Sequence, residues 1–263
     1  MGQDRPGTRV AVAQSRYEMS FPKTKDGFDQ DEEWCDVAID GEVRRIRFHD
    51  YDELFSVPGL YEQLFYDELK CDSPRTVCAL LAKDLKASGT SIGDLRVLDV
   101  GAGNGMVGEE LQKLGVDEIV GIDIIQEAAE AAKRDRPEVY DDYLVADLTD
   151  LTEKEARSLD EQRFNCLVTV AALGFGDIPP EAFATAFNAV DTGGWIVFNI
   201  KERFMEDTDP SGFSSLISKA LADGTIELRA EQRYRHRLSI AGNPLHYIAI
   251  VAEKRRDLPV ASQ

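Results

Sequence analysis

The chain has 263 residues with 49 acidic and 30 basic side chains, which gives a net charge of −19 at neutral pH. This surplus repels polyanions and disfavours DNA or RNA as a partner, and the length predicts one main core. Apolar runs stay well short of the ~20 residues needed to cross a bilayer, so we expect no membrane association.

The four cysteines and three histidines form neither a CxxC pair nor a zinc-like spacing. We therefore predict no metal site and expect reduced thiols in a cytoplasmic protein. The basic run Arg233, Arg235, His236 and Arg237 is an exception to the acidic composition. We interpret it as the charged face of a strand rather than as a nucleic-acid patch.

The N-terminal part of the chain is predicted to form an arm and a hairpin. Residues 1–30 are polar and rich in Gly, Pro, Asp and Lys, which is typical of a mobile or loosely attached arm. Residues 33–48 alternate between apolar and polar side chains and are interrupted by Asp40-Gly41, a two-residue turn signal. The sequence therefore predicts a small β-hairpin after the arm.

Two helices are predicted before the main sheet. Apolar residues recur at helical spacing over 61–69 and 74–86. Ser73 is placed to cap the second helix, and Pro74 stands at its first position. Together with the hairpin, these helices are expected to form a lid or substrate cap over residues 31–90.

From residue 95 onward, strand-like and helix-like segments alternate, as in a parallel sheet with helices on both faces. The predicted strands span 96–100, 118–122, 143–146, 166–171 and 195–199. The predicted helices span 104–114, 125–134, 153–158, 181–190 and 213–221. Two further strands, 225–238 and 245–253, are joined by a link too short for a helical crossover, so they must pair antiparallel. We expect one α/β domain over residues 91–257.

A glycine-rich turn follows the first strand of this domain. The strand 97–100 leads into Gly101, Gly103 and Gly105 and then into a helix, so the backbone turns sharply and its N–H groups face a ligand. The missing Gly-Lys-Ser/Thr excludes a Walker phosphate loop. Asp99 precedes the turn, where a buried carboxylate is costly unless it is hydrogen-bonded or close to a cation. The turn is therefore predicted to hold a cofactor.

Further candidate ligand contacts follow the next strands at the same edge of the sheet. Asp123 lies 18 residues after Gly105, near the ~20-residue spacing at which a carboxylate accepts hydrogen bonds from ribose hydroxyls. Asp147 is placed to accept from an adenine amino group, and Val170 and Ala171 would form an apolar wall. As simpler alternatives, Asp123 would cap the next helix, Asp147 would be a solvated turn acid, and the wall would be ordinary core.

These segments resemble the successive motifs of class I S-adenosylmethionine (SAM)-dependent methyltransferases. The segments are 97–105, 121–123, 146–148 and 193–198. Within that class, residues 101–114 and 171–173 are similar to relatives of methyltransferase-like protein 27 from the Williams–Beuren region. The resemblance implies a Rossmann-like seven-stranded mixed sheet of order 3-2-1-4-5-7-6, with its last strand antiparallel and helices on both faces. Residues 91–257 would then be the methyltransferase domain.

The resemblance also implies SAM as the cofactor. The expected cofactor-binding residues are Asp99, Gly101, Ala102, Gly103, Asn104, Gly105, Asp123, Ile124, Ala146, Asp147, Leu148, Val170 and Ala171. A dinucleotide is the competing cofactor, because Gly103, Gly105 and Gly108 also satisfy GxGxxG. Asp99, which would lie near the ammonium and sulfonium of SAM, and the closing antiparallel hairpin favour the methyltransferase.

The methyl acceptor is expected to approach over the residues that follow the fourth and fifth strands, under the N-terminal elements. The aromatic-rich segment 48–66 is predicted to cover the donor or, alternatively, only to attach the extension to the domain. The candidate catalytic residues are His49 and Glu202, and the candidate substrate-binding residues are Tyr51, Tyr66, Leu173 and Arg203. Methyl transfer is an in-line displacement at an activated carbon, so positioning supplies much of the acceleration without a dedicated base.

We predict a methyltransferase that acts on an oxygen or nitrogen atom of a small molecule. Residues 171–174 read AALG where exocyclic-amine DNA methyltransferases carry Asn/Asp-Pro-Pro-Tyr/Phe, and the chain has no Pro-Cys nucleophile. The alternatives are a protein or RNA methyltransferase, a non-catalytic donor-binding regulatory protein, and an NAD(P)-dependent oxidoreductase. The sequence indicates neither the acceptor nor the oligomeric state.

Overall fold

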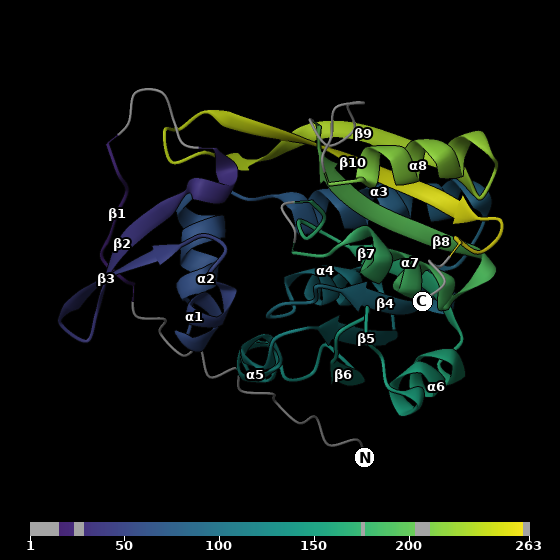
Figure 1. Cartoon of the computed structure of the whole chain (residues 1–263), viewed down its shortest axis with the longest axis horizontal. Coiled ribbons are helices and arrows are strands. Elements are labelled where there is room, and N and C mark those ends of the chain that lie inside the picture. Colours follow the sequence, from purple (N-terminus) through teal and green to yellow (C-terminus); the bar gives the residue numbers. More distant parts are fainter. Residues whose placement is uncertain (1–15, 24–28, 175–176, 203–210, 260–263) are drawn as a thin grey trace, which may run out of the picture.

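Two β-sheets with their helices form the structure, a computed structural model that describes residues 16–23, 29–174, 177–202 and 211–259. The larger sheet has the strand order β6-β5-β4-β7-β8-β10-β9 (Figure 1). Its strands are β4 (Arg96–Val100), β5 (Glu118–Asp123), β6 (Asp142–Val145), β7 (Phe164–Thr169), β8 (Val190–Lys201), β9 (Ile226–Leu238) and β10 (Pro244–Lys254). Strand β10 is antiparallel to both of its neighbours, whereas β4 to β8 pair in parallel. This topology confirms the predicted α/β fold and strand order.

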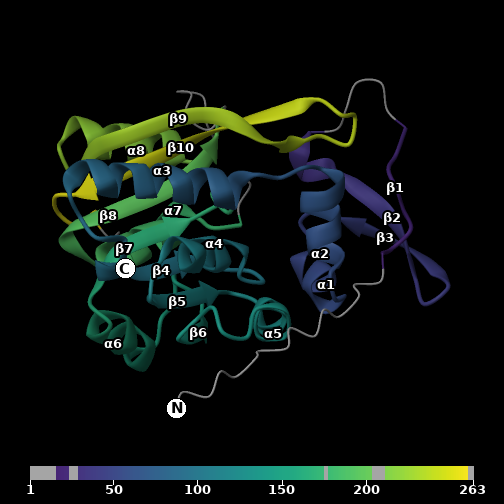
Figure 2. The same ribbon diagram turned by 180° about the vertical axis from the view of Figure 1, so that it is seen from behind.

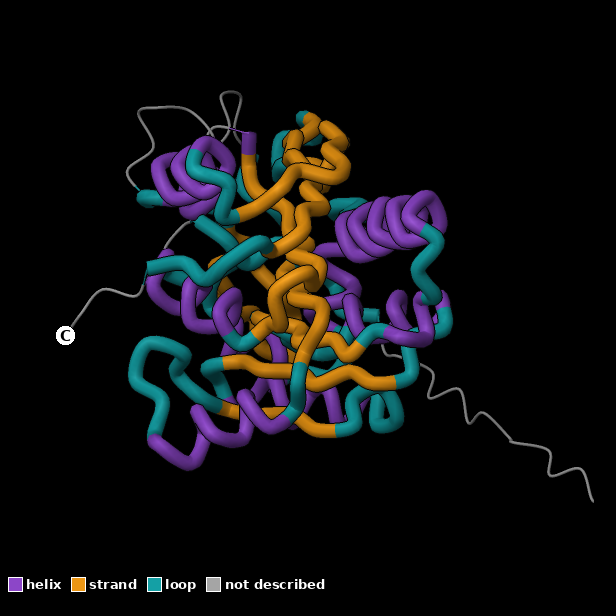
Figure 3. The backbone as a smooth tube through the Cα atoms, turned by 90° about the vertical axis from the view of Figure 1, so that its right-hand side faces the viewer, coloured by secondary structure: helices purple, strands orange, loops and turns teal. Residues whose placement is uncertain are grey.

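Helices cover both faces of this sheet (Figure 3). They are α3 (Ser73–Ser88), α4 (Met106–Leu114), α5 (Gln126–Asp135), α6 (Glu153–Glu161), α7 (Pro180–Asn188) and α8 (Phe213–Ala222). One core lies between the sheet and α3 and α4, and the other lies between the sheet and α6, α7 and α8. Val77, Leu81 and Leu85 of α3 recur at helical spacing and face the first core. Among the described residues, no helix is both long and apolar enough to span a membrane.

The predicted elements of this domain are present, with ends that differ by a few residues. Helix α4 begins at Met106 rather than at 104 because Gly105, at φ 88°, occupies the position before its first turn. Strand β7 ends at Thr169 rather than at 171 because Ala171 is left-handed, at φ 60°. Both differences occur where a strand or helix meets the edge of the sheet that was expected to bind ligands.

The residues before α3 form a second, smaller sheet. Its strands, in the order β1-β2-β3, are β1 (Met19–Ser20), β2 (Trp34–Ile39) and β3 (Glu42–Arg47). The predicted hairpin is confirmed, with Asp40 and Gly41 at φ 53° and 85° in its turn. Met19 and Ser20 lie within the predicted flexible arm but pair antiparallel with β2. This part of the expected arm is therefore attached to the small sheet.

Short helices connect the small sheet to α3. They are α1 (Tyr51–Ser56), α2 (Leu60–Glu62) and the π-helical η2 (Gln63–Glu68). Two further short helices are η1 (Gln30–Glu32), between β1 and β2, and η3 (Ile92–Asp94), after α3. The helix predicted over 61–69 is thus present in α2 and η2, whereas α1 was not predicted. Ser73 does not cap α3, because the helix begins at Ser73 itself, after Asp72. Its hydroxyl instead contacts Tyr234 and His236 of β9.

A buried ion pair attaches the N-terminal extension (residues 16–72) to the hairpin of β9 and β10, beside which it lies in Figure 2. Arg237 donates from Nη2 to Glu33 Oε2 at 2.6 Å, and the two side chains are 3% and 1% exposed. Glu33 Oε1 accepts from the backbone N–H of Ile240 at 2.8 Å. Because both carboxylate oxygens and the guanidinium are out of water, the position of the extension depends on this pairing.

We expect Glu33→Ala to lower the free energy of unfolding by about 3–5 kcal/mol, because it leaves the Arg237 charge buried without its partner. Urea unfolding measures this loss. The matched control is Asp36→Ala, since Asp36 pairs with Arg45 at the surface, where the side chains are 28% and 60% exposed. That variant should lose at most about 1 kcal/mol. Equal losses in the two variants would contradict the role given to Glu33.

Candidate functional site

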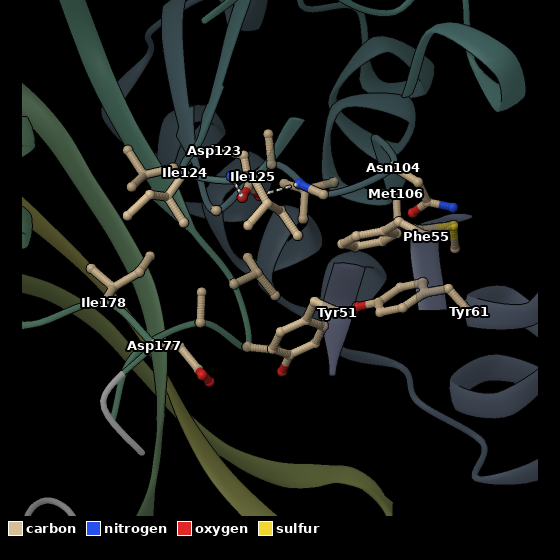
Figure 4. Close-up of a pocket in the computed structure, with 18 of the residues that line it drawn as sticks. Tyr51, Phe55, Tyr61, Asn104, Met106, Asp123, Ile124, Ile125, Asp177 and Ile178 are labelled. Atoms are coloured by element: carbon tan, nitrogen blue, oxygen red, sulfur yellow. Dashed lines mark hydrogen bonds between the residues drawn. The ribbon is translucent and has the colours of Figure 1, made fainter. Parts of the chain in front are cut away.

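A cavity of about 430 Å³ lies between the N-terminal extension and the carboxyl ends of β4, β5, β6 and β7. Its volume is in the range of small-molecule sites, and its place is where α/β sheets bind ligands. In Figure 4, Tyr51, Phe55 and Tyr61 of the extension lie across this cavity from Asp123 and Ile125. The cavity is thus formed by two separate parts of the chain.

The sheet side of the cavity contains most of the predicted cofactor-binding residues. Those that line it are Gly101, Ala102, Gly103, Asn104, Asp123, Ile124, Ala146, Asp147, Leu148, Val170 and Ala171. Gly105 and Asp99 belong to the same turn but do not line the cavity. The structure therefore brings together residues from four strand ends that are up to 70 positions apart in sequence.

The glycines of the turn allow the close approach of the extension. Gly101 and Gly103 have φ values of 69° and 54°, a left-handed conformation that favours glycine. A Cβ on Gly103 would lie 3.0 Å from Cζ of Phe55 in α1. The backbone at Gly103 is therefore in contact with the extension on one side and open to the cavity on the other.

Asp123 joins the ends of β4 and β5. Its Oδ2 accepts from the N–H of Gly103 at 3.0 Å, and its Oδ1 accepts from the N–H of Ile125 at 3.3 Å (dashed in Figure 4). Burial raises the pKa of this carboxyl, while the backbone N–H groups act in the opposite direction. Asp123 is not the cap of α5, a position held by Ile125. It offers carboxylate oxygens to the cavity instead.

A second set of contacts ties the extension to the glycine turn. Asn104 donates from Nδ2 to Glu62 Oε1 at 3.0 Å, and Arg136 donates from Nη1 to the same oxygen at 2.7 Å. Arg136 also pairs with Glu109 of α4 and is only 9% exposed. In addition, Arg134 donates to the carbonyl oxygen of Phe55 at 3.0 Å. Helices α1 and α2 are thus fixed over the cavity by charged groups from the main domain.

Asp99 lies beneath the turn, outside the cavity. It is completely buried, and its Oδ2 accepts from the Tyr140 hydroxyl at 2.7 Å, whereas Oδ1 has no partner among the described residues. Burial, with a smaller contribution from nearby Asp123, raises its pKa to about 7 against the opposing effect of the Tyr140 hydrogen bond. Asp99 does not line the cavity, and its contact with the ammonium of a cofactor stays a prediction.

The ends of β6 and β7 contribute an acidic turn residue and part of the cavity wall. Asp147 Oδ1 accepts from both the N–H and the hydroxyl of Thr149, at 2.8 and 2.7 Å, so Asp147 is a turn acid that also lines the cavity. Ala171 lines the cavity in its left-handed conformation. Its N–H donates to Asn199 Oδ1 at 2.6 Å. A side-chain amide of β8 therefore holds a backbone position that a residue with a Cβ rarely adopts.

The extension side of the cavity is aromatic. Phe48, Tyr51, Phe55, Tyr61, Phe65 and Tyr66 line it, joined near its far end by His236 and Tyr247 from β9 and β10. His49 lies at its rim, where Nδ1 contacts Asp177 Oδ2 at 3.1 Å, and both side chains are partly exposed. This pair connects the extension to the segment after β7. Of the predicted acceptor-side residues, His49, Tyr51 and Tyr66 thus lie at the cavity.

Two other acceptor-side candidates, Glu202 and Leu173, do not line the cavity. Glu202 forms a bidentate pair with Arg233 on the exposed surface, at 2.9 and 3.0 Å; Glu202 follows β8, and Arg233 belongs to β9, on the other side of β10. Leu173 is 2% exposed and packs in the core, next to the cavity residue Ile178. Arg203 lies outside the described residues. Phe55 and His236 are two of the several lining residues that were not predicted individually.

Phe55 and His236 differ in how clearly the sequence indicated them. Phe55 lies within the aromatic-rich segment, so its density of rings was a usable indication. His236 lies in the basic run of β9, which we interpreted as a charged strand face. The alternation of a strand places every second residue on one face, but it does not tell which face is covered by another part of the chain.

The buried Asp99 gives a prediction for the pH dependence of stability. Its pKa is about 7 in the folded protein and about 3.9 in the unfolded chain, so the folded protein holds an extra proton in between. The unfolding free energy of the wild type, relative to Asp99→Asn, should therefore fall as the pH rises from about 4 to about 7, by up to about 4 kcal/mol, and then level off. Urea unfolding of both proteins across this range measures the difference, and a constant difference would contradict the raised pKa.

Several solved structures with a similar fold are described as methyltransferases. A SAM-dependent methyltransferase from Clostridium acetobutylicum has a TM-score of 0.51 and 12% identity, over 74% of this chain and 96% of that one. A putative RNA methyltransferase from Pyrococcus horikoshii has a TM-score of 0.50 and 15% identity, over 70% and 87%. Magnesium protoporphyrin IX methyltransferase from Synechocystis, solved with bound SAM, has a TM-score of 0.46 and 16% identity, over 69% and 79%. At these identities the similarity shows the fold alone.

A family model described as a methyltransferase domain matches residues 69–233, well over half of the chain. A search of curated proteins gives no match. The matched segment contains the glycine turn and the ends of β4, β5, β6 and β7, and it confirms the expectation of a SAM-dependent methyltransferase at the level of the family. The chain therefore belongs to the methyltransferase-domain family.

Proposed function

We propose that this chain transfers a methyl group from SAM to an oxygen or nitrogen atom of a small molecule. The observation that carries this proposal is the cavity itself, which has most of the predicted cofactor-binding residues of the sheet on one side and aromatic residues of the extension on the other. An acceptor that enters this space must be small enough to share it with the donor.

The sheet side fits SAM through groups that are already oriented. Asp123 would accept hydrogen bonds from the ribose hydroxyls, since its carboxylate is fixed by the N–H groups of Gly103 and Ile125. Asp147 would accept from the adenine amino group with the oxygen that Thr149 does not use. The open backbone of Gly101 and Gly103 would contact the methionine part. SAM supplies an activated methyl carbon when bound.

The extension side fits a small acceptor better than a macromolecule. Phe55 is 5% exposed and Tyr61 is half-buried, because they pack on each other and on α5. They cover the part of the cavity next to Asp123 instead of leaving a groove for a protein or RNA chain. The net charge of −19 further disfavours a nucleic acid.

In the transfer, the acceptor's lone pair forms the new bond to the methyl carbon as the carbon–sulfur bond breaks, and the electron pair of that bond goes to sulfur. The acceptor then loses a proton. His49 is the candidate to take it, because imidazole exchanges protons near neutral pH and the Asp177 carboxylate holds its Nδ1. Tyr51 and Tyr66 would contact the acceptor. Most of the acceleration would come from holding the two reactants in line.

Two finer expectations stay predictions. The closer similarity to relatives of methyltransferase-like protein 27 rests on residues 101–114 and 171–173. The cytoplasmic location rests on the four cysteines, which are free in the structure. A non-catalytic donor-binding role and an NAD(P)-dependent reaction are outcomes that the following experiments separate from the proposal.

We expect calorimetric titration to show binding of S-adenosylhomocysteine and no response to NAD or NADP. Asp123→Ala should weaken this binding by about 10- to 100-fold, because hydrogen bonds from the ribose to a charged group are lost. Asp150→Ala, an exposed acid outside the cavity, is the matched control and should bind as the wild type does. Binding of NAD instead of S-adenosylhomocysteine would overturn the proposal.

Incubation with labelled SAM and a metabolite extract tests the acceptor class. We expect label in a compound small enough to pass an ultrafiltration membrane, and Asp123→Ala should reduce its amount. Label in the extract's protein or RNA fraction would contradict the small-molecule acceptor while leaving the methyltransferase intact. Donor binding without label in any fraction would favour the regulatory role.

A further inference from the structure

The far end of the cavity contains His236, which the proposed reaction does not yet use. The side chain is 5% exposed, lines the cavity and lies against the ring of Tyr247, with 4.1 Å between ring centroids. Its Nδ1 is 2.6 Å from the hydroxyl oxygen of Ser73. Its Nε2 makes no hydrogen bond within the described part of the chain. Because Nε2 is not among the fully enclosed atoms that lack a partner, it is accessible from the cavity that His236 lines.

Three buried side chains behind His236 form a connected network. The backbone N–H of Ala171 can only donate, so the Asn199 atom that it contacts at 2.6 Å is the amide oxygen. The Asn199 amide nitrogen is therefore the donor, to Tyr234 Oη at 2.6 Å and to Ser73 Oγ at 3.2 Å. Ser73 Oγ and Tyr234 Oη are themselves 2.6 Å apart. The orientation of the Asn199 amide thus fixes two of the donors in the network.

The donors of the remaining hydrogen bonds, among Tyr234, Ser73 and His236, follow from a count of the available hydrogens. If Tyr234 donates to Ser73, the Ser73 hydrogen can point to His236 Nδ1 at 2.6 Å, a stronger acceptor than the nearby sulfur of Cys71, and every hydrogen of the network has a partner. If Ser73 donates to Tyr234, the Tyr234 hydrogen has no acceptor among the described residues, in a side chain that is 9% exposed. A buried unpaired hydroxyl hydrogen costs about 1–3 kcal/mol. The first arrangement is favoured, so Nδ1 of His236 is an acceptor and its proton sits on Nε2.

The surroundings of His236 keep it uncharged. Burial lowers its pKa well below the usual value, and the positive charges of Arg237 and Lys201 lower it further. The neutral ring carries one proton, on the nitrogen that faces the cavity. His236 is therefore placed to donate a hydrogen bond rather than to remove a proton.

We propose that His236 donates a hydrogen bond from Nε2 to an oxygen or ring nitrogen of the methyl acceptor, and that the acceptor is an uncharged, ring-containing molecule. Two charged side chains of the cavity wall are already paired, Arg237 with Glu33 and Asp177 with His49, so neither is offered to a charged acceptor. Phe65 and Tyr66 provide surfaces for a ring. The proposal rests on the methyltransferase function proposed above.

The tautomer of His236 is tested by nitrogen NMR of the protein loaded with S-adenosylhomocysteine. We expect long-range proton–nitrogen correlations to show a neutral ring with its proton on Nε2, unchanged from about pH 5.5 to about pH 8. His236→Phe identifies the signals, and His246→Gln assigns those of a histidine outside the cavity. A proton on Nδ1, or a ring that becomes charged in this range, would overturn the proposal.

The network is tested with Ser73→Ala, which removes the hydroxyl behind Nδ1 and leaves the cavity wall in place. We expect a mixture of the two His236 tautomers in this variant, with S-adenosylhomocysteine affinity unchanged. A purely structural role of Ser73 would lower stability without moving the tautomer, and that outcome would contradict the proposal.

The acceptor class is tested with benzamide as a probe, a neutral ring with a carbonyl oxygen, and with benzylamine as its charged counterpart. In the loaded wild type, benzamide should shift the Nε2–H signal of His236 and benzylamine should not. His236→Phe keeps a ring against Tyr247 but has no donor, so its affinity for benzamide should fall about tenfold. An equal response to both probes, or unchanged benzamide affinity in the variant, would overturn the inference. If the wild-type protein does not bind S-adenosylhomocysteine, the proposed function itself is wrong.

Discussion

The Asn199 amide connects the three parts of the molecule that form the site. Its oxygen accepts from Ala171 after β7, and its nitrogen donates to Ser73 at the start of α3 and to Tyr234 of β9. Asn199 is completely buried, so each of these bonds replaces a bond to water that folding removes. One side chain thereby fixes the wall of the donor site, the first residue of α3 and the strand that carries His236.

This dependence explains why strain can persist at Ala171. A residue with a Cβ at φ 60° costs about 1–3 kcal/mol and persists only where its neighbours determine the conformation. Here the Asn199 oxygen takes the N–H of Ala171, and Gly101 leaves the adjacent space that a Cβ would fill, 2.9 Å from the Cβ of Ala172. The wall that would face the methyl group is therefore held in place by a buried side chain of the sheet.

The sequence was sufficient for the elements that depend on local patterns. Alternating strand and helix periods predicted the strands, and the resemblance to class I methyltransferases supplied their order. The spacing of Gly101, Gly103 and Asp123 indicated residues that line the sheet side of the cavity. The place of Asp99 was not predictable, because its partner Tyr140 is 41 positions away and comes from a loop. Likewise, the capping role expected of Ser73 was overridden by tertiary partners, Tyr234 and His236, that lie about 160 positions later.

The acceptor side could be predicted only in composition. Aromatic residues between 48 and 66 indicated a cover, but a strand pattern does not state which of its faces another segment covers, so His236 was grouped with the exposed arginines of β9. Glu202 was expected at the catalytic edge because it follows the end of β8. Arg233 of β9 instead pairs with it at the surface. Long-range pairing decided both cases, and no local signal encodes it.

The two histidines of the cavity have opposite electrostatic surroundings, which suits them to different tasks. His49 has the carboxylate of Asp177 beside its ring at the rim, whereas His236 is buried near the cations Arg237 and Lys201. Titratable groups whose surroundings differ in this way are commonly divided between proton transfer and hydrogen bonding in one active site. Because methyl transfer depends mainly on alignment, a neutral donor that orients the acceptor contributes to rate as directly as a base does. The proton can then leave at the rim, where His49 is in contact with water.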